Sequence, residues 1–376
     1  MEDSLSELAS NIEGSQLVVP CTELDKTLPF FLKELGFRLD QIFPADNPSV
    51  AVVSGYGATL RLTRGAQGEP GTLRLLYNDP SAFPGNSETL TAPNGMRIEF
   101  IEAHPPLVMP PTKHQFMVRK LTDSDPWVIG RAGMQYRDLV PDRLGGSMIA
   151  SHIRVPVKGP VPDNVHFHIV GFQMIYCYRG WVRLVYEDQG EPFILAAGDC
   201  VLQPPQIRHR VLESSGTLEV IEIGCPAEHI TTLDHDMDLP TGRLDPDKDF
   251  HGQIFCRHEV ADAIWEPWRI AGFEARDTGI GKATAGVASV KVVRPANASD
   301  GPAETPWTSL DGDIYFCFVL EGSLTLEGEG HELRNLKMGD AFVIPPHLKT
   351  RLSNCSADME LLEVTLPAEF KTTVHD

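Results

Sequence analysis

Two short segments of the sequence carry side chains suited to binding a metal ion. His166 and His168 stand two residues apart, and His209 follows the proline pair at 204–205. Residues two apart on a β-strand point to the same face, so His166 and His168 are expected to project together into one cavity. Neutral imidazole nitrogens are ligands for divalent transition metals. We therefore predict that His166, His168 and His209 hold one metal ion and leave positions open for substrate, water or dioxygen.

The spacing around these histidines resembles the paired motifs of the cupin superfamily. The HxH pair is followed by Gln173 and Gly180, and the second motif runs from Gly198 through Pro204 to His209. The resemblance extends from roughly residue 130 to residue 365. It implies a jelly-roll β-barrel that holds a metal ion inside.

The sequence departs from the cupin motifs at three positions. Gln173 stands where the family usually has a glutamate ligand, Gln206 replaces a glycine, and Glu213 replaces an asparagine. A neutral amide does not offset the charge of a metal ion, so a site of three histidines favours anionic, enolate-like ligands. Gln173 is therefore a candidate catalytic residue, either as a weak fourth ligand or as a hydrogen-bond donor beside the metal.

His152 is the second candidate catalytic residue. It lies in the strand expected before the HxH segment. If it faces the cavity, it could act as a general acid or base. The alternation of side chains is equally compatible with an outward orientation, and the residues alone leave both open.

The resemblance also suggests an activity. Cupin dioxygenases that act on diketones, gentisate-type aromatics and thiols are similar in using three histidines. Our leading hypothesis is thus a metal-dependent dioxygenase acting on a small organic substrate that chelates the ion through oxygen, with iron(II) favoured over manganese, nickel, zinc or copper. Two alternatives stay open: an isomerase, cyclase or lyase that uses the same metal without oxygen, and a non-catalytic protein that binds small molecules.

An internal repeat defines the organisation of the chain. Segment 132–138 recurs as 271–277, an offset of 139, and the pair at 198–199 recurs at 339–340, an offset of 141. A near-constant offset indicates that a whole domain has been duplicated. Short runs rich in Val, Ile, Leu, Phe and Tyr, separated by Gly and Pro, favour β-strands throughout this region. The fold class expected is mainly β, with a first cupin barrel at 106–233, a linker at 234–250 and a second cupin barrel at 251–376.

The second copy lacks the metal-binding residues of the first. Thr308 and Leu310 fall at the HxH positions, Tyr315 at the glutamate position and Thr350 at the last histidine. None of these side chains offers a strong ligand, so the second barrel is expected to be free of metal. Arg137 and Arg276 occur at matching positions in both copies, which favours a structural role for them.

Residues 1–105 form a different, small α+β module. A helix is expected over 25–35, with strands near 17–19, 50–54 and 59–63. This order resembles one βαβββ unit of the glyoxalase, or vicinal oxygen chelate, family, and Glu99 lies in a segment that resembles its closing strand, where a glutamate often binds metal. No histidine or glutamine stands on the first strand to join Glu99. The module is therefore expected to be degenerate and non-catalytic.

Composition limits the partners and the compartment. The formal charge of −20, from 52 acidic against 32 basic residues, argues against nucleic acid as a partner. The chain shows neither a signal peptide nor an apolar run long enough to span a membrane. Its seven cysteines include no CxxC pair and favour reduced thiols. We expect a cytoplasmic protein that binds a small-molecule substrate, with a homodimer possible through exposed sheet edges.

Overall fold

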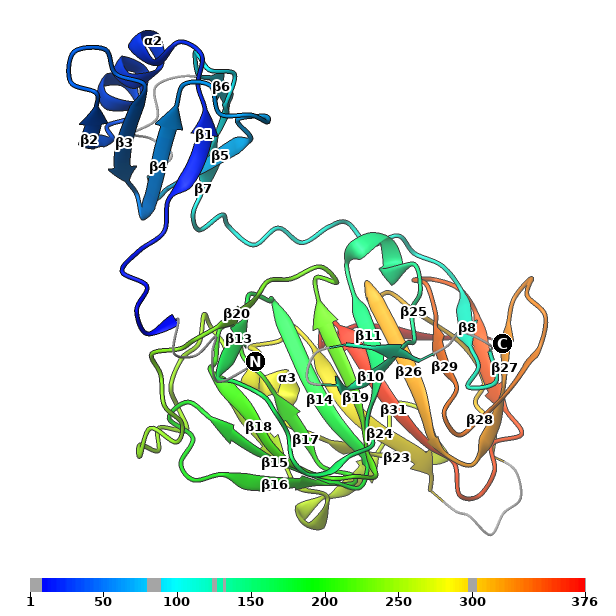
Figure 1. The fold of residues 1–376 in the computed structure, drawn as a ribbon. Helices are drawn as coiled ribbons and strands as arrows, with labels where there is room; N and C mark the ends of the chain where they lie inside the picture. Colours follow the sequence, from blue (N-terminus) through cyan, green and yellow to red (C-terminus); the bar gives the residue numbers. More distant parts are fainter. Residues whose placement is uncertain (1–8, 80–88, 124–126, 131–132, 297–302, 376) are drawn as a thin grey trace. The chain divides into compact units, whose positions relative to one another are not determined.

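The computed structural model describes residues 9–79, 89–123, 127–130, 133–296 and 303–375 (Figure 1). Ala132, the first residue of one repeat segment, lies outside these ranges. The chain divides into two compact units, Met1–Pro106 and Leu107–Asp376. Among the described residues, no helix combines the length and apolar character needed to cross a membrane.

The first unit begins with one strand, one helical segment and three further strands. The sheet order is β1-β4-β3-β2, with β1 parallel to β4. The helical segment packs against this sheet through Phe31, which is fully buried. The helix changes from α to wider π turns just after Pro29, which has no amide proton to donate. The bounds are β1 Leu17–Pro20, α2 Leu24–Pro29, η1 Phe30–Glu34, β2 Arg38–Phe43, β3 Val50–Gly55 and β4 Ala58–Thr63.

A second, three-stranded sheet completes the first unit in the order β5-β7-β6. Its strands are β5 Thr72–Tyr77, β6 Thr89–Thr91 and β7 Arg97–Glu102. Glu99 on β7 lies 2.9 Å from a guanidinium nitrogen of Arg74 and 3.2 Å from one of Arg97. The carboxylate is therefore held in ion pairs. The strand and helix order agrees with the expected one, and the resemblance to the glyoxalase family stays a prediction.

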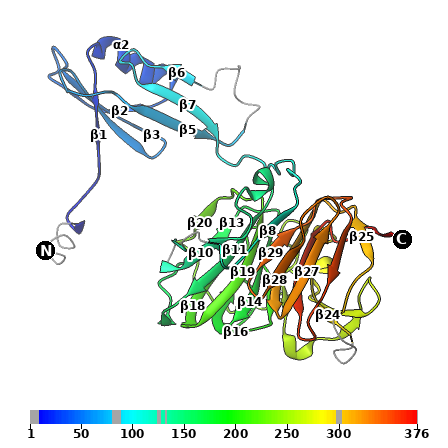
Figure 2. The same cartoon turned by 90° about the vertical axis from the view of Figure 1, so that its right-hand side faces the viewer.

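The second unit is built from two β-sandwiches, each with a seven-stranded sheet and a smaller sheet facing it (Figures 1 and 2). The first sandwich has the orders β21-β17-β14-β19-β11-β10-β9 and β16-β15-β18-β13-β20, with β12 on β18. Its strands are β9 Val128–Ile129, β10 Gln135–Asp138, β11 Ile149–Val155, β12 Lys158–Pro160, β13 His166–His168, β14 Phe172–Arg179, β15 Trp181–Tyr186, β16 Phe193–Ala196, β17 Cys200–Leu202, β18 His209–Ser215, β19 Leu218–Cys225, β20 Thr231–Leu233 and β21 Cys256–His258.

The second sandwich repeats this arrangement. Its sheet orders are β22-β23-β24-β31-β26-β29-β8 and β28-β27-β30-β25-β32. Its strands are β8 Met117–Arg119, β22 Trp265–Pro267, β23 Phe273–Asp277, β24 Ser289–Pro295, β25 Trp307–Leu310, β26 Ile314–Glu321, β27 Ser323–Gly328, β28 Arg334–Lys337, β29 Ala341–Val343, β30 Thr350–Ser353, β31 Glu360–Leu366 and β32 Thr372–His375.

The prediction of a mainly β fold with two jelly-roll copies is confirmed, and neither copy closes into a single continuous barrel. In each copy the strands form two separate hydrogen-bonded sheets. Strongly twisted sheets of many strands split readily into two packed layers, and jelly rolls do so with their side chains filling the space between. The metal-ligand candidates are therefore expected between the two sheets of the first sandwich.

The two seven-stranded sheets share one hydrophobic core. On β14, Phe172 and Met174 are fully buried in this core, together with Phe316 and Phe318 of β26. The alternate residue Ile175 faces the interior of the first sandwich. Both faces of each seven-stranded sheet are thus buried, one against the other sandwich and one against its own smaller sheet.

The two sandwiches also exchange strands reciprocally. β8 precedes the first sandwich in sequence but pairs with β29 of the second. β21 precedes the second sandwich but pairs with β17 of the first. The repeated Gly-Asp turns receive the exchanged segments, because Asp340 Oδ1 accepts from the Leu121 amide at 2.7 Å and Asp199 Oδ1 accepts from the Val260 amide at 2.8 Å. Each sandwich thereby covers an edge of the other.

Arg137 and Arg276, the arginines at matching positions of the repeat, each donate a hydrogen bond to the other sandwich, as expected for a structural role. Arg137 Nη2 donates to the Gly339 carbonyl at 2.5 Å, and Arg276 Nη1 donates to the Gly198 carbonyl at 3.0 Å. Arg276 also hydrogen-bonds Tyr176 Oη at 2.8 Å. Burial lowers the pKa of Arg137 to about 10, and its Nε and Nη1 have no hydrogen-bond partner.

This asymmetry predicts unequal losses of stability. We expect Arg276→Met to lower the free energy of unfolding by about 3 kcal/mol or more, because hydrogen bonds from a charged donor contribute roughly 1.5–3 kcal/mol each. Arg137→Met should lower it by about half as much or less, since two of its buried nitrogens are unsatisfied. Urea unfolding of the two variants measures both values, and equal losses would contradict the assignment.

Segment 234–250, which was expected to be a linker, contains neither helix nor strand, only isolated bridges at Leu244 and Phe250. It is nevertheless tied to the first sandwich. Lys248 Nζ lies 2.6 Å from a Glu187 oxygen and 2.9 Å from an Asp188 oxygen, and Thr241 Oγ1 donates to Asp188 at 2.7 Å. The segment therefore lies along the surface of the first sandwich.

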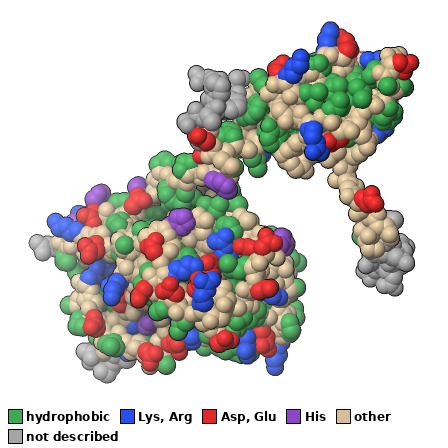
Figure 3. All heavy atoms as spheres, turned by 90° about the vertical axis from the view of Figure 1, so that its left-hand side faces the viewer, with side chains coloured by type: hydrophobic (Ala, Val, Ile, Leu, Met, Phe, Trp, Pro, Cys, Tyr) green, Lys and Arg blue, Asp and Glu red, His purple; other side chains and the backbone are tan. Residues whose placement is uncertain are grey.

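Charged side chains of both signs are interspersed over the second unit on the face drawn in Figure 3. Acidic and basic residues often lie side by side there. The acidic excess of the chain is thus spread among basic residues on this face. The seven cysteines form no disulfide.

Candidate metal centre

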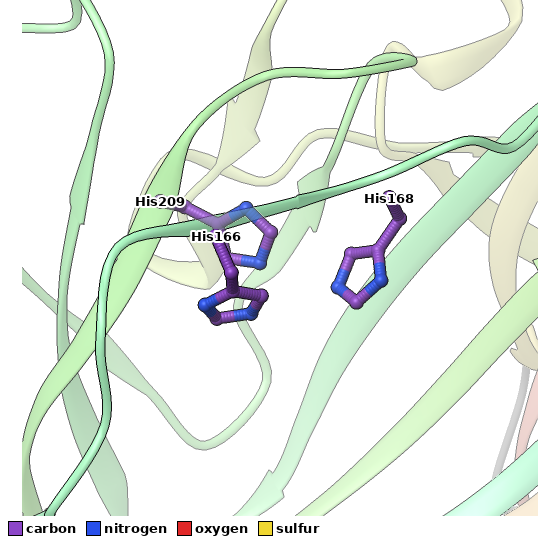
Figure 4. Close-up of side chains that lie close together, drawn as sticks. All are labelled: His166, His168 and His209. Carbon is purple, nitrogen blue, oxygen red and sulfur yellow. The ribbon is translucent and has the colours of Figure 1, made fainter. Parts of the chain in front are cut away.

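The structure brings His166, His168 and His209 together inside the first sandwich (Figure 4). His166 and His168 are the ends of β13 and project to the same side, and His209 opens the neighbouring strand β18 directly opposite His166. The ring centroids of His166 and His209 are 4.2 Å apart. The ligand atoms of the three rings all lie within 4.8 Å of one another, so small side-chain rotations suffice for metal–nitrogen bonds of about 2.1 Å.

Hydrogen bonds to Nδ1 orient all three rings. His166 Nδ1 donates to the Asn164 carbonyl at 2.7 Å, and His209 Nδ1 donates to the Ile207 carbonyl at 3.0 Å. His168 Nδ1 lies 2.9 Å from the hydroxyl of Thr231. A protonated Nδ1 places the lone pair of the ring on Nε2, which is the nitrogen that then binds a metal. The donor set and its orientation fit one divalent transition metal ion.

The Thr231 hydroxyl offers a direct test of this orientation. We expect Thr231→Val to weaken metal binding by about 10-fold, since loss of a partner that orients a ligand typically costs 10- to 100-fold in affinity. Titration of the metal-free protein with zinc measures the change. Thr232→Val on the same strand is the matched control and should leave the affinity unchanged. An equal effect of both substitutions would point to a general change in the strand.

Gln206 adopts the backbone conformation of the motif glycine that it replaces in the turn before His209. Gln206 has φ +62°, the left-handed conformation for which glycine is favoured. Its amide donates to the His168 carbonyl at 3.0 Å, which connects the turn to β13. Glu213, at the asparagine position of the motif, instead pairs with Arg183 on β15. Gln206 therefore supports the site through its backbone.

The three histidines lie in the wall of a cavity of about 340 Å³ between the two sheets of the first sandwich. Apolar side chains from both sheets, such as Ile153 and Leu184, form most of the wall. Among the described residues that line it, Glu222 is the only carboxylate and none is lysine or arginine. The cavity thus combines a set of metal ligands with an apolar interior, as small-molecule sites commonly do.

Gln173 lies close to the cavity and contacts the carboxylate there. Its side chain is buried on β14, and its Nε2 donates to Glu222 Oε1 at 2.6 Å. Glu222, on the adjacent strand β19, lines the cavity. The amide that replaces the motif glutamate is therefore paired with a carboxylate from another strand.

The side chain of His152 points away from the cavity that contains the three histidines. The cavity-lining residues of β11 include Ser151 and Ile153, so the alternate residue His152 points to the opposite face. There its ring packs edge-on against Phe318 of the second sandwich at 5.7 Å, and its Nε2 lies 2.5 Å from Glu219 Oε2. Burial lowers the pKa of His152, and hydrogen bonding to Glu219 only partly offsets this. His152 thus lies between the two sandwiches.

Sequence reasoning missed several polar residues of the cavity wall: Tyr186, Gln203, Glu222 and His229. Tyr186 stacks on His209 with ring centroids 5.5 Å apart, and its hydroxyl accepts from Gln203 Nε2 at 3.0 Å. His229 lies 5.4 Å from His168 between ring centroids. A signal for Glu222 was present in the sequence, because it recurs as Glu363 at the offset of 141 that relates the two copies.

The equivalent place in the second sandwich contains a guanidinium group. Arg269 Nη1 lies 2.8 Å and 2.6 Å from the two oxygens of Glu363, and its Nη2 donates to Tyr315 Oη at 3.0 Å. Thr308 and Thr350 face one another here, as His166 and His209 do in the first sandwich. Only about 20 Å³ of space remains. Protein side chains fill this place.

Comparison with solved structures identifies the fold. Salicylate 1,2-dioxygenase from Pseudaminobacter salicylatoxidans matches with a TM-score of 0.53 and 16% identity, over 71% of this chain and 90% of that chain. A variant of that enzyme in complex with gentisate matches with a TM-score of 0.52 and 16% identity, over 71% of this chain and 88% of that chain. Oxalate decarboxylase from Bacillus subtilis matches with a TM-score of 0.50 and 12% identity, over 69% of this chain and 78% of that chain.

No protein-family model matches this sequence, and no curated protein is significantly similar to it. At these low identities the structural likeness establishes the arrangement of strands, while activity needs separate evidence. The chain shares the fold of these two enzymes over about seven tenths of its length.

Proposed function

We propose that this protein is a metal-dependent dioxygenase, in which His166, His168 and His209 hold one iron(II) ion and a small organic substrate chelates it through oxygen atoms. The observation that carries the proposal is the convergence of three buried imidazoles, each hydrogen-bonded at Nδ1, on one cavity. Three protein ligands leave coordination positions for both a chelating substrate and dioxygen.

The residues around the ion have distinct parts in this proposal. A bound divalent ion supplies Lewis acidity toward the chelating oxygens. Gln173 fixes the Glu222 carboxylate at the cavity wall, and Tyr186 stacks on His209 to hold its ring in place. The apolar wall excludes water from the reacting groups. His152 is then a positioning residue between the sandwiches, in place of the general acid or base suggested by its sequence position.

Oxygen consumption tests the proposal directly. Iron-loaded protein is mixed with panels of diketones, flavonols and dihydroxy-aromatics, and oxygen uptake is followed with an electrode. We expect at least one substrate to consume oxygen in a manner that requires both iron and His166. Uptake by none of the panels, from protein shown to contain iron, would count against a dioxygenase.

A lyase or isomerase that uses the same ion without oxygen is the second candidate. One structural match is a decarboxylase, so the fold also accommodates chemistry of that class. Turnover that persists under nitrogen, with manganese or zinc as effective as iron, would favour this second candidate. Turnover that stops without oxygen would favour the dioxygenase.

A further inference from the structure

The internal repeat allows the first sandwich to be compared with the second at the level of single side chains. Gln173 and Glu222 in the first correspond to Tyr315 and Glu363 in the second, at offsets of 142 and 141. The pairing is also the same, because Gln173 Nε2 donates to Glu222 at 2.6 Å and Tyr315 Oη donates to Glu363 at 2.7 Å. Each sandwich therefore directs a carboxylate, held by its neighbour on the next strand, toward the space between its two sheets.

The second sandwich shows what such a carboxylate binds. Nη1 of Arg269 donates to the two oxygens of Glu363, at 2.8 and 2.6 Å, and the guanidinium occupies the space that corresponds to the cavity of the first sandwich. Burial acts to lower the pKa of Arg269, but Glu363 and Tyr315 together outweigh this effect and raise it. A carboxylate at this position thus accepts hydrogen bonds from a donor group inside the sandwich.

Among the described residues, none of those that line the cavity of the first sandwich is an arginine, and about 340 Å³ of space is left there instead. A ligand in this space would lie between Glu222 of the seven-stranded sheet and the three histidines of the smaller sheet. Asp163, which is nearly fully buried, adds a second carboxylate behind His166, with its Oδ2 3.7 Å from Nδ1. The partly buried carboxylate of Glu222 and the buried carboxylate of Asp163 already oppose the double positive charge of a divalent ion, so each further negative charge on a ligand is disfavoured.

We infer that Glu222 selects the substrate, and that the cavity takes an uncharged chelating molecule which keeps a hydroxyl proton when it binds the metal, such as a vicinal diol or enediol. On binding, one hydroxyl would release its proton to the buffer and its oxygen would bind the ion, while the retained hydroxyl would donate to Glu222. A substrate with a carboxylate beside its hydroxyl would meet no lysine or arginine among the described residues of the wall, and it would place a further negative charge near Glu222 and Asp163.

This inference deepens the proposed function and rests on its metal site. Its test measures binding under nitrogen to protein loaded with zinc, which performs no redox chemistry. The probes are catechol and salicylate, two aromatic rings of similar size that chelate through adjacent oxygens and differ in the carboxylate. Calorimetry gives both dissociation constants for the wild-type protein and for Glu222→Gln, a substitution of nearly equal shape that keeps the acceptor for Gln173.

We expect the wild-type protein to bind catechol at least about tenfold more tightly than salicylate. Glu222→Gln should weaken catechol by about tenfold, the loss of one hydrogen bond to a charged acceptor, while salicylate binds as well as before or better. Glu213→Gln, whose side chain pairs with Arg183 outside the cavity, is the matched control and should change neither value. Zinc content and melting temperature verify that each variant is folded and loaded.

The outcomes separate this inference from the proposed function. Wild-type protein that binds no zinc would overturn both. Zinc-loaded protein that binds no catechol, that prefers salicylate, or whose preference survives Glu222→Gln would overturn the role of Glu222 alone. The expected preference together with no oxygen uptake by the iron form would overturn the dioxygenase and leave the role of Glu222 supported.

Discussion

Replacing His166 by alanine is expected to weaken metal binding by about two orders of magnitude. Structural zinc sites with four ligands contribute about 10–16 kcal/mol in all, so one ligand accounts for about 3 kcal/mol, which is about 100-fold in affinity. His209→Ala should have a similar effect, because both rings are buried and oriented by a backbone carbonyl. Zinc titration of the metal-free protein, with metal content measured after dialysis, gives the values.

His235→Ala is the control for the histidine variants. His235 is exposed, beyond the end of β20, and outside the three-histidine cluster. Its replacement should leave zinc affinity unchanged. Wild-type affinity in the His166→Ala protein would show that the cluster does not hold the ion, and the proposed chemistry would lose its basis.

Removal of Arg269 is expected to produce the largest loss of stability in the second sandwich. Glu363 is almost fully buried and receives two hydrogen bonds from Arg269. Arg269→Met leaves this carboxylate without a counter-charge, and breaking a buried ion pair in this way costs about 3–5 kcal/mol. Urea unfolding of the variant, followed by fluorescence, measures the decrease in the free energy of unfolding.

The double variant Arg269→Met with Glu363→Gln shows whether the uncompensated charge is the cause. The glutamine carbonyl still accepts from Tyr315 Oη, and no net charge remains buried. Most of the lost stability should therefore return. If the double variant is as unstable as Arg269→Met, the loss reflects packing of the Arg269 side chain against Trp268, where the guanidinium lies 4.0 Å from the ring centroid.

The sequence was sufficient to predict that the three histidines meet. The two-residue spacing of His166 and His168 and the proline turn before His209 are local features, and strand geometry converts them into one cluster. The duplication was also visible, because the offsets of the Gly-Asp turns and of the paired arginines report a repeated domain. These arginines donate hydrogen bonds from one sandwich to the Gly-Asp turns of the other.

The orientation of His152 could not be derived from alternation. On a sheet with one solvent face, polar and apolar residues reveal which side is inside. On β11 both faces are buried, since Ala150 packs in the core shared by the sandwiches and Ile153 lines the cavity. The alternation therefore assigns the residues of β11 to two opposite faces, but it does not show which face lines the cavity with the three metal-ligand candidates.

Local sequence determined the three imidazoles and the two β-rich copies, because strand periodicity and turn chemistry act over a few residues. Only the tertiary structure decided that Glu222 lies beside Gln173 and that Arg269 fills the equivalent place in the second sandwich. It also decided that β8 pairs with the second sandwich and β21 with the first. These contacts join residues far apart in the chain. Their pairing depends on how whole sheets pack, which no short segment encodes.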